Sequence, residues 1–300
     1  MLVIVKLMGG LGNQLFQYAM GRRLALQRQA TLRLDLSFLG DTSDNIHTLR
    51  SYELGLFPGL GAAPLSADET YQLERTTHLP YRLYNKARHS LGLVPAFQYV
   101  GEGEYFTPNS SVVAGGPPAH LLHLDGYWQN ERYFADIAST LRQELAFAPL
   151  ADVRNQAVAK QMQRSPRPTV SLHVRRGDYA QFTAFGMCSV AYYERALAYM
   201  HQHLADPIFF VFSDDIAWVR ENLRLPSGTE FIDWNQGPAS HHDIHLMSLC
   251  QHHVIANSSF SWWGAWLNPK PDKLVVSPKH WMAAPLVAAD RVVPEAWLKL

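Results

Sequence analysis

Two adjacent arginines follow an apolar run near the middle of the chain, in the sequence His-Val-Arg-Arg-Gly-Asp-Tyr at positions 173–179. The residues before them, Thr-Val-Ser-Leu at 169–172, alternate as in a buried strand. Open α/β sheets bind ligands at the carboxyl ends of their strands, and a guanidinium is planar, always charged and suited to phosphate. Arg175 and Arg176 therefore predict an anionic, phosphate-bearing ligand. An ion-paired or solvated surface is the alternative interpretation.

A glycine-rich loop, Gly-Gly-Leu-Gly at 9–12, separates a predicted first strand at 1–7 from a helix that begins near Asn13. Glycines let a backbone approach a ligand closely, and Asn13 and Gln14 bring amide donors to the helix start. The loop fails the G-x-G-x-x-G pattern because Leu15 replaces the third glycine, and it lacks the Gly-Lys-Ser/Thr of a P-loop. A nicotinamide enzyme and a P-loop kinase are therefore disfavoured. A tight strand-to-helix turn is the structural alternative.

Two further strand ends carry polar groups. An apolar run at 207–212 ends at Ser213 and Asp214, and the directly adjacent Asp215 lacks the Asp-x-Asp spacing of a metal site. A helix N-cap is the alternative role for these residues. After a short strand at 254–256, Ser258, Ser259 and Phe260 begin a helix whose free N–H groups and dipole suit a phosphate.

Composition excludes several classes of protein. Lys plus Arg and Asp plus Glu both number 26, so no global basic field favours nucleic acid. Cys188 and Cys250 are the only cysteines, which excludes a disulfide framework and a cysteine-based zinc site and fits a reducing compartment. His241 and His245 would share a helix face, but the neighbouring pattern does not favour a metal site. Residues 1–7 are too short for a membrane span and lack the basic region of a secretory signal, so we expect neither there.

The order of elements predicts two domains, residues 1–150 and 151–300, with a linker region at 148–168. Residues 40–110 show no sustained period, and we expect short elements and loops there that shape a variable pocket. Strands are expected at 30–36, 120–124 and 273–277. Helices are expected at 152–163, 190–203 and 243–250, with a further helix ending near Glu144 and a terminal helix at 291–300.

Four segments in this order resemble the α-1,2-fucosyltransferases of glycosyltransferase family 11: residues 9–17, 173–179, 210–215 and 257–266. The resemblance implies an α/β GT-B fold, in which two Rossmann-like domains face each other across a cleft. It also implies GDP-fucose as donor, inversion at the anomeric carbon, no metal and no cofactor. The N-terminal domain would lie on the acceptor side, and the C-terminal domain would bind GDP-fucose.

The resemblance also assigns roles to single residues. Arg175 resembles the arginine that holds the β-phosphate of the donor, with His173 and Arg176 in support. Asp214, beside Ser213, resembles the aspartate that reads the guanine edge. Ser258, Ser259 and Phe260 resemble the segment around the diphosphate and base, and Asn13 would reach the donor from the other domain. These roles form the expected donor site.

Inversion also requires a base near the acceptor hydroxyl, and Asp178 is the nearest carboxylate in sequence. Pairing with Arg176 or capping of the Gly177 turn is its structural alternative. We expect transfer of L-fucose to the 2-hydroxyl of a galactose residue in an oligosaccharide or lipid-linked glycan. Transfer to a 6-position and a non-catalytic GDP-sugar-binding protein stay open. The expected location is cytoplasmic, with peripheral association at the inner membrane face also open.

Overall fold

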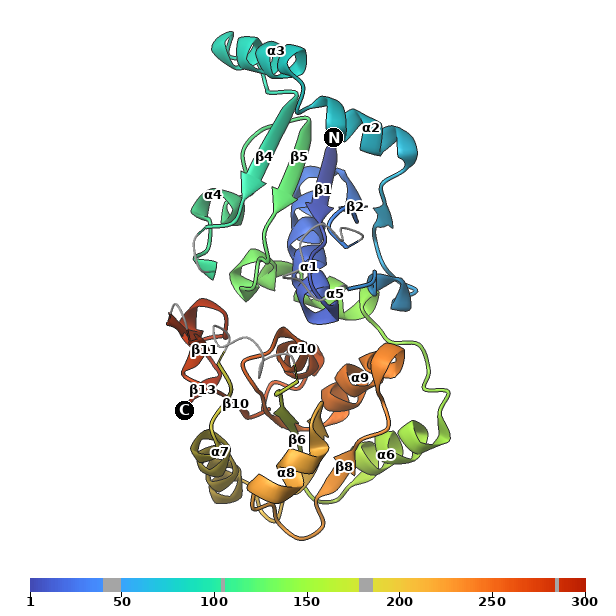
Figure 1. Cartoon of the computed structure of the whole chain (residues 1–300), viewed down its shortest axis with the longest axis vertical. Coiled ribbons are helices and arrows are strands. Elements are labelled where there is room, and N and C mark those ends of the chain that lie inside the picture. The colour runs from blue at the N-terminus through green and yellow to red at the C-terminus, as the bar shows by residue number, and fades with distance from the viewer. Residues whose placement is uncertain (40–49, 104–105, 178–185, 284–285) are drawn as a thin grey trace. The chain divides into compact units, whose positions relative to one another are not determined.

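The computed structural model describes residues 1–39, 50–103, 106–177, 186–283 and 286–300. Within these residues the chain divides into two compact units, Met1–Phe147 and Ala148–Leu300. Each unit is built around a parallel β-sheet with helices in the connections (Figure 1). Each unit is therefore Rossmann-like.

The N-terminal unit contains a five-stranded sheet in the order β3-β2-β1-β5-β4. Its strands are β1 (Leu2–Lys6), β2 (Thr31–Asp35), β3 (Ala63–Pro64), β4 (Phe97–Gly101) and β5 (Leu121–Asp125). Its helices are α1 (Leu11–Arg28), α2 (Ala67–Arg75), α3 (Leu79–Ser90), α4 (Ser110–Val113) and α5 (Ala138–Glu144), with short 3-10 turns at Leu54–Leu56, Glu131–Tyr133 and Ala135–Ile137.

Helix α1 covers one face of this sheet at close range. A Cβ atom on Gly21 would lie 3.0 Å from the Leu32 side chain and 3.3 Å from that of Val5, so the glycine lets the helix approach the strands. Helices α2 and α3, by contrast, contain no buried residue. The two helices therefore add little to the core of this unit.

The C-terminal unit contains a six-stranded sheet in the order β13-β10-β9-β6-β7-β8. Its strands are β6 (Thr169–Val174), β7 (Ile208–Ser213), β8 (Glu230–Ile232), β9 (His252–Val254), β10 (Val275–Ser277) and β13 (Leu298–Lys299), and a separate hairpin pairs β11 (His280–Met282) with β12 (Val287–Ala288). The helices are α6 (Val153–Arg164), α7 (Val190–His203), α8 (Ile216–Asn222), α9 (His241–Leu249) and α10 (Ser259–Leu267), with 3-10 turns at Gly237–Ala239 and Ala289–Arg291.

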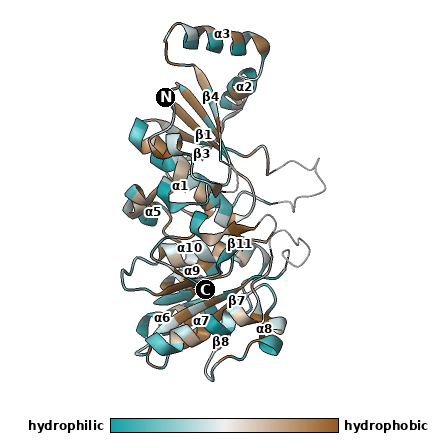
Figure 2. Cartoon of the chain, turned by 90° about the vertical axis from the view of Figure 1, so that its left-hand side faces the viewer, coloured by the Kyte–Doolittle hydropathy of each residue, from teal (hydrophilic) through white to brown (hydrophobic). Residues whose placement is uncertain are grey.

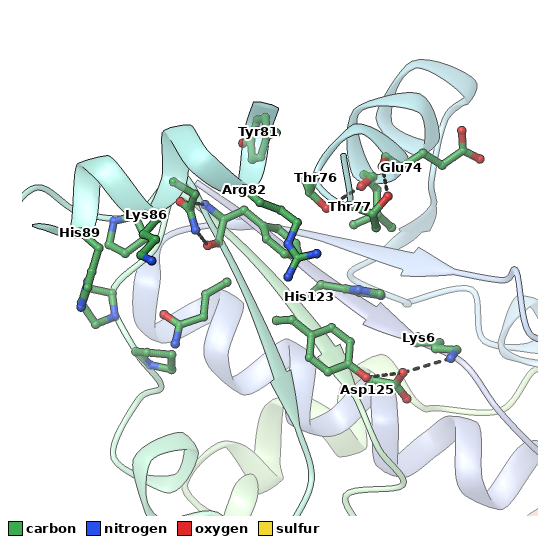
Figure 3. A pocket seen from close by; sticks show the side chains of 18 residues that line it. Lys6, Glu74, Thr76, Thr77, Tyr81, Arg82, Lys86, His89, His123 and Asp125 are labelled. Carbon is green, nitrogen blue, oxygen red and sulfur yellow. Dashed lines mark hydrogen bonds and ion pairs between the residues drawn. The ribbon is translucent and has the colours of Figure 1, made fainter. Parts of the chain in front are cut away.

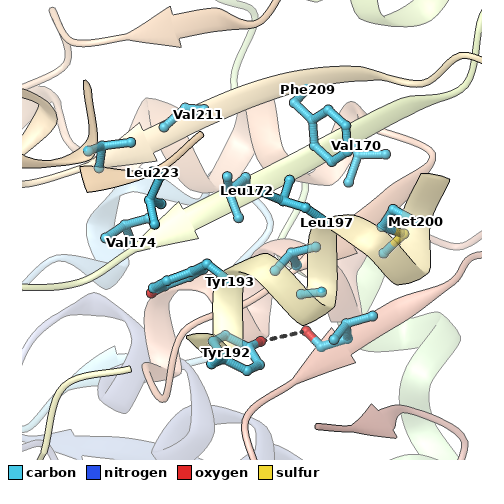
Figure 4. Packing of buried hydrophobic residues seen from close by; sticks show 14 residues of the cluster. Val170, Leu172, Val174, Tyr192, Tyr193, Leu197, Met200, Phe209, Val211 and Leu223 are labelled. Carbon is cyan, nitrogen blue, oxygen red and sulfur yellow. Dashed lines mark hydrogen bonds between the residues drawn. The ribbon is translucent and has the colours of Figure 1, made fainter. Parts of the chain in front are cut away.

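The core of this unit lies between β6 and α7, because every residue of β6 is buried (Figure 4). Val170 and Leu172 pack with Leu197 and Met200 of α7. The buried Tyr192 hydroxyl donates to the Ile255 carbonyl at 2.6 Å and to the Val276 carbonyl at 3.2 Å. These contacts fix the strand from which the two arginines emerge.

Two expectations about elements are wrong. Residues 291–300 do not form a terminal helix, because Leu298 and Lys299 pair with Val276 and Ser277 as strand β13. Residues 67–90 are not loops and short elements but two helices, α2 and α3, and β4 follows them. The capping box of α2, in which Ser66 and Glu69 bond each other's backbone, was a sequence signal for the first of these helices.

Candidate active site

The two arginines lie where the strand order of the C-terminal sheet reverses. Strand β6 pairs with β7 on one side and with β9 on the other, so the loops after β6 and β9 leave neighbouring strand ends in different directions. Open α/β sheets bind ligands at such a switch point. Arg175 and Arg176 follow β6, while Ser258 follows β9 and precedes α10.

Arg175 pairs with Asp214, which comes from the end of β7. The Arg175 Nη1 and Asp214 Oδ2 atoms lie 3.1 Å apart, and Asp214 Oδ1 accepts the backbone N–H of Arg176 at 2.8 Å. A Cβ atom on Gly177 would lie 2.5 Å from Asp214 Oδ2, so the Asp214 carboxylate fills the space beside this glycine. The loops after β6 and β7 are therefore tied together through one carboxylate.

Arg176 is held by a second carboxylate and an aromatic ring. Its Nε lies 3.1 Å from Asp215 Oδ2, and its guanidinium carbon lies 4.0 Å from the Trp218 ring centre. Asp215 is the N-cap of α8, because its Oδ1 accepts the Trp218 backbone N–H at 3.1 Å. Ser213 Oγ in turn accepts the Asp215 backbone N–H at 3.0 Å. Arg176 and Ser213 thus have local structural partners.

The carboxylates of Asp214 and Asp215 both accept from nitrogen donors. Each of their four oxygens accepts from a backbone N–H or a guanidinium: Arg175 and Arg176 for Asp214, Trp218 and Arg176 for Asp215. A divalent cation at this pair would have to displace two guanidinium groups. The geometry therefore argues against the metal interpretation of this pair.

His173 is buried inside the switch point with a neutral ring. Burial, followed by the charge of Arg175, lowers the pKa of His173 to about 3. Its ring centre lies 5.8 Å from that of Phe260, at an interplanar angle of 35°. Within the described part of the chain, His173 Nδ1 has no hydrogen-bond partner. His173 therefore adds no positive charge and instead joins β6 to α10 by packing.

The start of α10 presents backbone groups near this ring. Ser258 is the N-cap residue in an extended conformation, and among the described residues its side chain makes no capping hydrogen bond. Ser259 and Phe260 begin the helix, whose first N–H groups carry the positive end of the helix dipole. Trp262, Trp263 and Trp266 anchor the same helix in the core. The helix start is thus rigidly supported.

Asn257 is a residue of this site that the sequence reasoning missed as a functional position. Its Nδ2 donates to the carbonyls of Gly186 at 3.0 Å and Trp281 at 3.2 Å, and its Oδ1 accepts from the Cys188 thiol at 3.3 Å. Asn257 is 5% exposed. It fastens the chain near residue 186 and strand β11 to the start of α10. A polar residue directly after a short buried strand was the available signal.

Asn13 and Gln14 belong to the N-terminal unit and have different roles. Gln14 Nε2 donates to the Gly9 and Ser51 carbonyls at 2.9 and 2.8 Å, so the expectation that Gln14 offers a ligand donor is wrong. Asn13 Oδ1 accepts from Gln129 Nε2 at 2.8 Å. The contact of Asn13 with the donor stays a prediction.

The N-terminal unit holds a groove of about 1030 Å³ on the sheet face that α1 leaves open (Figure 3). Helices α2 and α3 form one wall, with Arg82 and Lys86 of α3 directed toward the strands. On the strands, Asp125 lies 3.0 Å from Lys6 Nζ and accepts from the Tyr99 hydroxyl at 2.7 Å. Most of the groove lining is apolar, with these hydroxyls and ions among the rings, which suits a ligand that has both apolar faces and hydroxyls, such as a glycan.

Other predicted features lie outside this arrangement. Asp178 falls outside the described residues. Trp128 is fully buried and packs edge-on against Tyr133, so its ring belongs to the core. Across residues 1–39, 50–103, 106–177, 186–283 and 286–300 there is no cluster of three His, Cys, Asp or Glu side chains able to hold a metal, including at His241–His245. The same residues include no helix long and apolar enough to cross a membrane.

Known proteins resemble this chain along its whole length. The family model described as glycosyl transferase family 11 matches residues 102–300. An Escherichia coli α-1,2-colitosyltransferase is 30% identical over 307 residues, covering 100% of this chain and 99% of that protein. The E. coli O-antigen biosynthesis glycosyltransferase WbnK is 30% identical over 309 residues, covering 98% and 99%. The mouse galactoside 2-α-L-fucosyltransferase Sec1 is 30% identical over 160 residues, which is 50% of this chain and 43% of that protein.

The chain belongs to glycosyltransferase family 11. A solved structure of Arabidopsis thaliana FUT1 in complex with GDP resembles it with a TM-score of 0.51 at 12% identity, covering 98% of this chain and 74% of that one. This likeness and the two parallel sheets confirm the predicted α/β GT-B fold with two Rossmann-like units.

Proposed function

We propose that this protein transfers L-fucose from GDP-fucose to the 2-hydroxyl of a galactose residue, with inversion and without a metal or cofactor. The observation that carries the proposal is the position of Arg175, a cation directly after β6, whose neighbouring strand β9 leads into the start of α10 at the switch point of the C-terminal sheet. Membership of family 11 and the likeness to Sec1 over half the chain support fucosyl transfer.

Departure of GDP leaves negative charge on the diphosphate while the glycosidic bond breaks. A guanidinium and the N–H groups at the start of α10 stabilise such charge, because they are oriented before the reaction and need no reorganisation. Arg175 is the guanidinium in this proposal, and its 3.1 Å contact with Asp214 holds it in place. Ser258, Ser259 and Phe260 supply the helix start.

Asp214 is proposed to recognise guanine while retaining its local partners. A carboxylate has about four lone-pair positions, so oxygens that accept from Arg175 and Arg176 can also accept from guanine N1–H and N2–H. Uracil and adenine lack this pair of adjacent donors. Asp214→Asn would therefore weaken GDP binding by ~1.5–3 kcal/mol, the scale of a hydrogen bond to a charged group.

The acceptor is proposed to bind the N-terminal unit, in the groove beside Tyr99. Asp178 is the proposed base for the acceptor hydroxyl, and Asn13 the proposed contact from this unit to the donor. Tyr99→Ala should raise KM for a galactoside several-fold and leave GDP affinity unchanged, because Tyr99 contacts Asp125 and His123, which belong to the N-terminal unit. An unchanged acceptor KM would remove the groove from the acceptor site.

Transfer of colitose is a second candidate, favoured by the full-length likeness to the α-1,2-colitosyltransferase. Colitose is L-fucose without its 3-hydroxyl, so one pocket could receive either sugar. A polar group that bonds the 3-hydroxyl would discriminate strongly against the deoxy sugar, because it would be left unpaired in the complex.

Initial rates with GDP-fucose, GDP-colitose, GDP-mannose and UDP-galactose, each with a β-galactoside acceptor, test the proposal. We expect the highest kcat/KM with GDP-fucose. A preference for GDP-colitose would select the second candidate. GDP release without an acceptor-dependent product, or GDP binding without turnover, would contradict transferase activity and favour a non-catalytic binding protein.

A further inference from the structure

Helix α3 exposes a large apolar surface that covers no part of the core. The helix contains no buried residue, and Leu79, Leu83 and Tyr84 are 66%, 58% and 53% exposed. Leu91, directly after the helix, is 74% exposed. Large apolar side chains gathered on a soluble surface indicate a binding partner more often than single exposed ones do.

The helix has two distinct faces. Tyr81, Asn85 and His89 follow each other at four-residue spacing and line the groove, together with Arg82 and Lys86. Leu79, Leu83, Ala87 and Leu91 follow the same spacing and form the opposite, apolar face. Hydrophobic and hydrophilic residues accordingly mix along α3 in Figure 2. The apolar face is therefore separate from the groove.

The turn after α3 extends this apolar face. Arg88 Nε donates to the Val94 carbonyl at 3.0 Å, and the Arg88 carbonyl accepts the backbone N–H of Leu93 at 3.0 Å. These bonds fold the turn back onto the helix end. Leu93 and Val94, 49% and 42% exposed, thus lie beside Leu91.

Positive charge borders the apolar face. Residues 75–94 contain four Lys or Arg residues and no Asp or Glu, although acidic and basic residues are equal in number over the whole chain. At 100° per residue, Lys86 and Arg88 lie on opposite edges of the apolar face. An apolar face with cationic edges is complementary to a bilayer that has anionic head groups.

We propose that α3 and the turn after it, residues 79–94, dock this protein on an anionic lipid bilayer. The leucines enter the boundary between head groups and acyl chains, while Arg88, which does not line the groove, meets the lipid phosphates at the edge of the apolar face. The helix lies in the plane of the surface, and its groove-lining face stays open to ligand. This inference does not depend on the donor or the linkage proposed above.

Co-sedimentation of the full chain with vesicles tests the proposal. We expect binding to phosphatidylcholine vesicles that contain phosphatidylglycerol, weaker binding to pure phosphatidylcholine, and loss of binding as salt rises. Leu79→Asp should weaken binding about tenfold or more, since it removes a leucine that the bilayer would bury and adds a charge that the anionic lipids repel. Leu83→Asp should have a similar effect.

Val153→Asp is the matched control. Leu79 and Val153 are both the first residue of a 12-residue helix, are 66% and 74% exposed, and stand where a carboxylate favours the helix dipole. The control should bind vesicles like the unchanged protein. Circular dichroism should show that both variants fold.

Three outcomes would overturn the proposal. The first is equal binding of Leu79→Asp and Val153→Asp to anionic vesicles. The second is no vesicle binding at low salt. The third is a dimer in light scattering that Leu79→Asp dissociates without any effect on lipid, which would assign the face to a second copy of the chain.

Discussion

Arg175 is the residue on which the proposed reaction depends most. Its positive charge and its planar, bidentate geometry make separable contributions to catalysis. Lysine keeps the charge but loses the planar bidentate contact, and alanine loses both. Turnover should therefore fall stepwise from Arg to Lys to Ala. Loss of a preorganised donor to developing charge costs about 10²–10³ in kcat.

Arg176→Ala is the comparison for this series. Its guanidinium is engaged by Asp215 and Trp218, so its removal should reduce kcat less than Arg175→Ala does. A folded Arg175→Ala variant that keeps more than about a tenth of kcat, a loss below ~1.4 kcal/mol, would remove Arg175 from the reaction.

Gly177 leaves the space that Asp214, the ion-pair partner of Arg175, occupies. An alanine here would place Cβ 2.5 Å from Asp214 Oδ2, so the carboxylate must move and the 3.1 Å contact with Arg175 must break. Gly177→Ala should weaken GDP binding about tenfold, or ~1.4 kcal/mol, in calorimetry. Gly101→Ala, whose nearest neighbour would be 3.8 Å away, is the control. Gly177→Ala with unaltered GDP affinity would show that the Arg175–Asp214 contact does not matter for binding.

His173 should make the protein less stable in acid. Its pKa is about 3 in the folded chain and ~6.5 when unfolded, so between these values the unfolded chain binds more protons. The free energy of unfolding therefore falls as pH drops below 6.5, by ~1.4 kcal/mol per pH unit from this residue.

Urea unfolding of the unchanged protein and His173→Gln, at pH 7.5 and 5.0, measures this effect. The acid-induced loss should be smaller in the variant by about 2 kcal/mol. Half-buried His245, with a pKa of about 4, acts in the same direction, and Asp243, whose pKa burial raises to about 7, opposes it. Both contributions cancel in the comparison. If the free energy of unfolding fell by the same amount in both proteins, His173 would not be held in its neutral form by burial.

At the scale of elements, the start of α10 depends on Asn257. Asn257→Ala would leave the Gly186 and Trp281 carbonyls without their amide donor, a loss of ~1–3 kcal/mol. We expect a lower Tm and a higher KM for donor, because Ser258 and Ser259 lose their anchor. Asn257→Asp has a similar shape but lacks the amide N–H donor, and it should show the same changes as Asn257→Ala. If both variants kept the KM of the unchanged protein for the donor, the start of α10 would not need Asn257 to bind the donor.

Elements with strong local signals could be predicted from the sequence, and others could not. The alternation before Arg175 predicted β6, and a run with good helix formers predicted α7 over 190–203. The last ten residues were misread because Leu298 gains its partner from β10, 22 positions earlier at Val276. Pairing between distant segments leaves no local pattern. Helix α3 was missed, and its residues 79–90 include no buried side chain of the kind that marks a core-facing helix.

At the scale of the whole molecule, the order of the sequence motifs predicted the family to which the chain belongs. The contacts between single residues could be seen only in the structure. The sequence placed Arg175, Ser213 and Ser258 at strand ends, and the sheet order brings those ends together. It could not show that Asp214 contacts Arg175 or that Asp215 caps α8, because both aspartates follow the same strand. Division of donor and acceptor between the two units remains our proposal.

The central claim is that one chain moves fucose from GDP-fucose to a galactose 2-hydroxyl with its own cations. The direct measurement is transfer to a β-galactoside in the presence of EDTA, with the product linkage read by NMR. We predict an α-linked fucose on the 2-position, formed at the same rate with and without chelator. A 6-linked product, or a rate that falls in EDTA and returns with Mg²⁺ or Mn²⁺, would contradict the account.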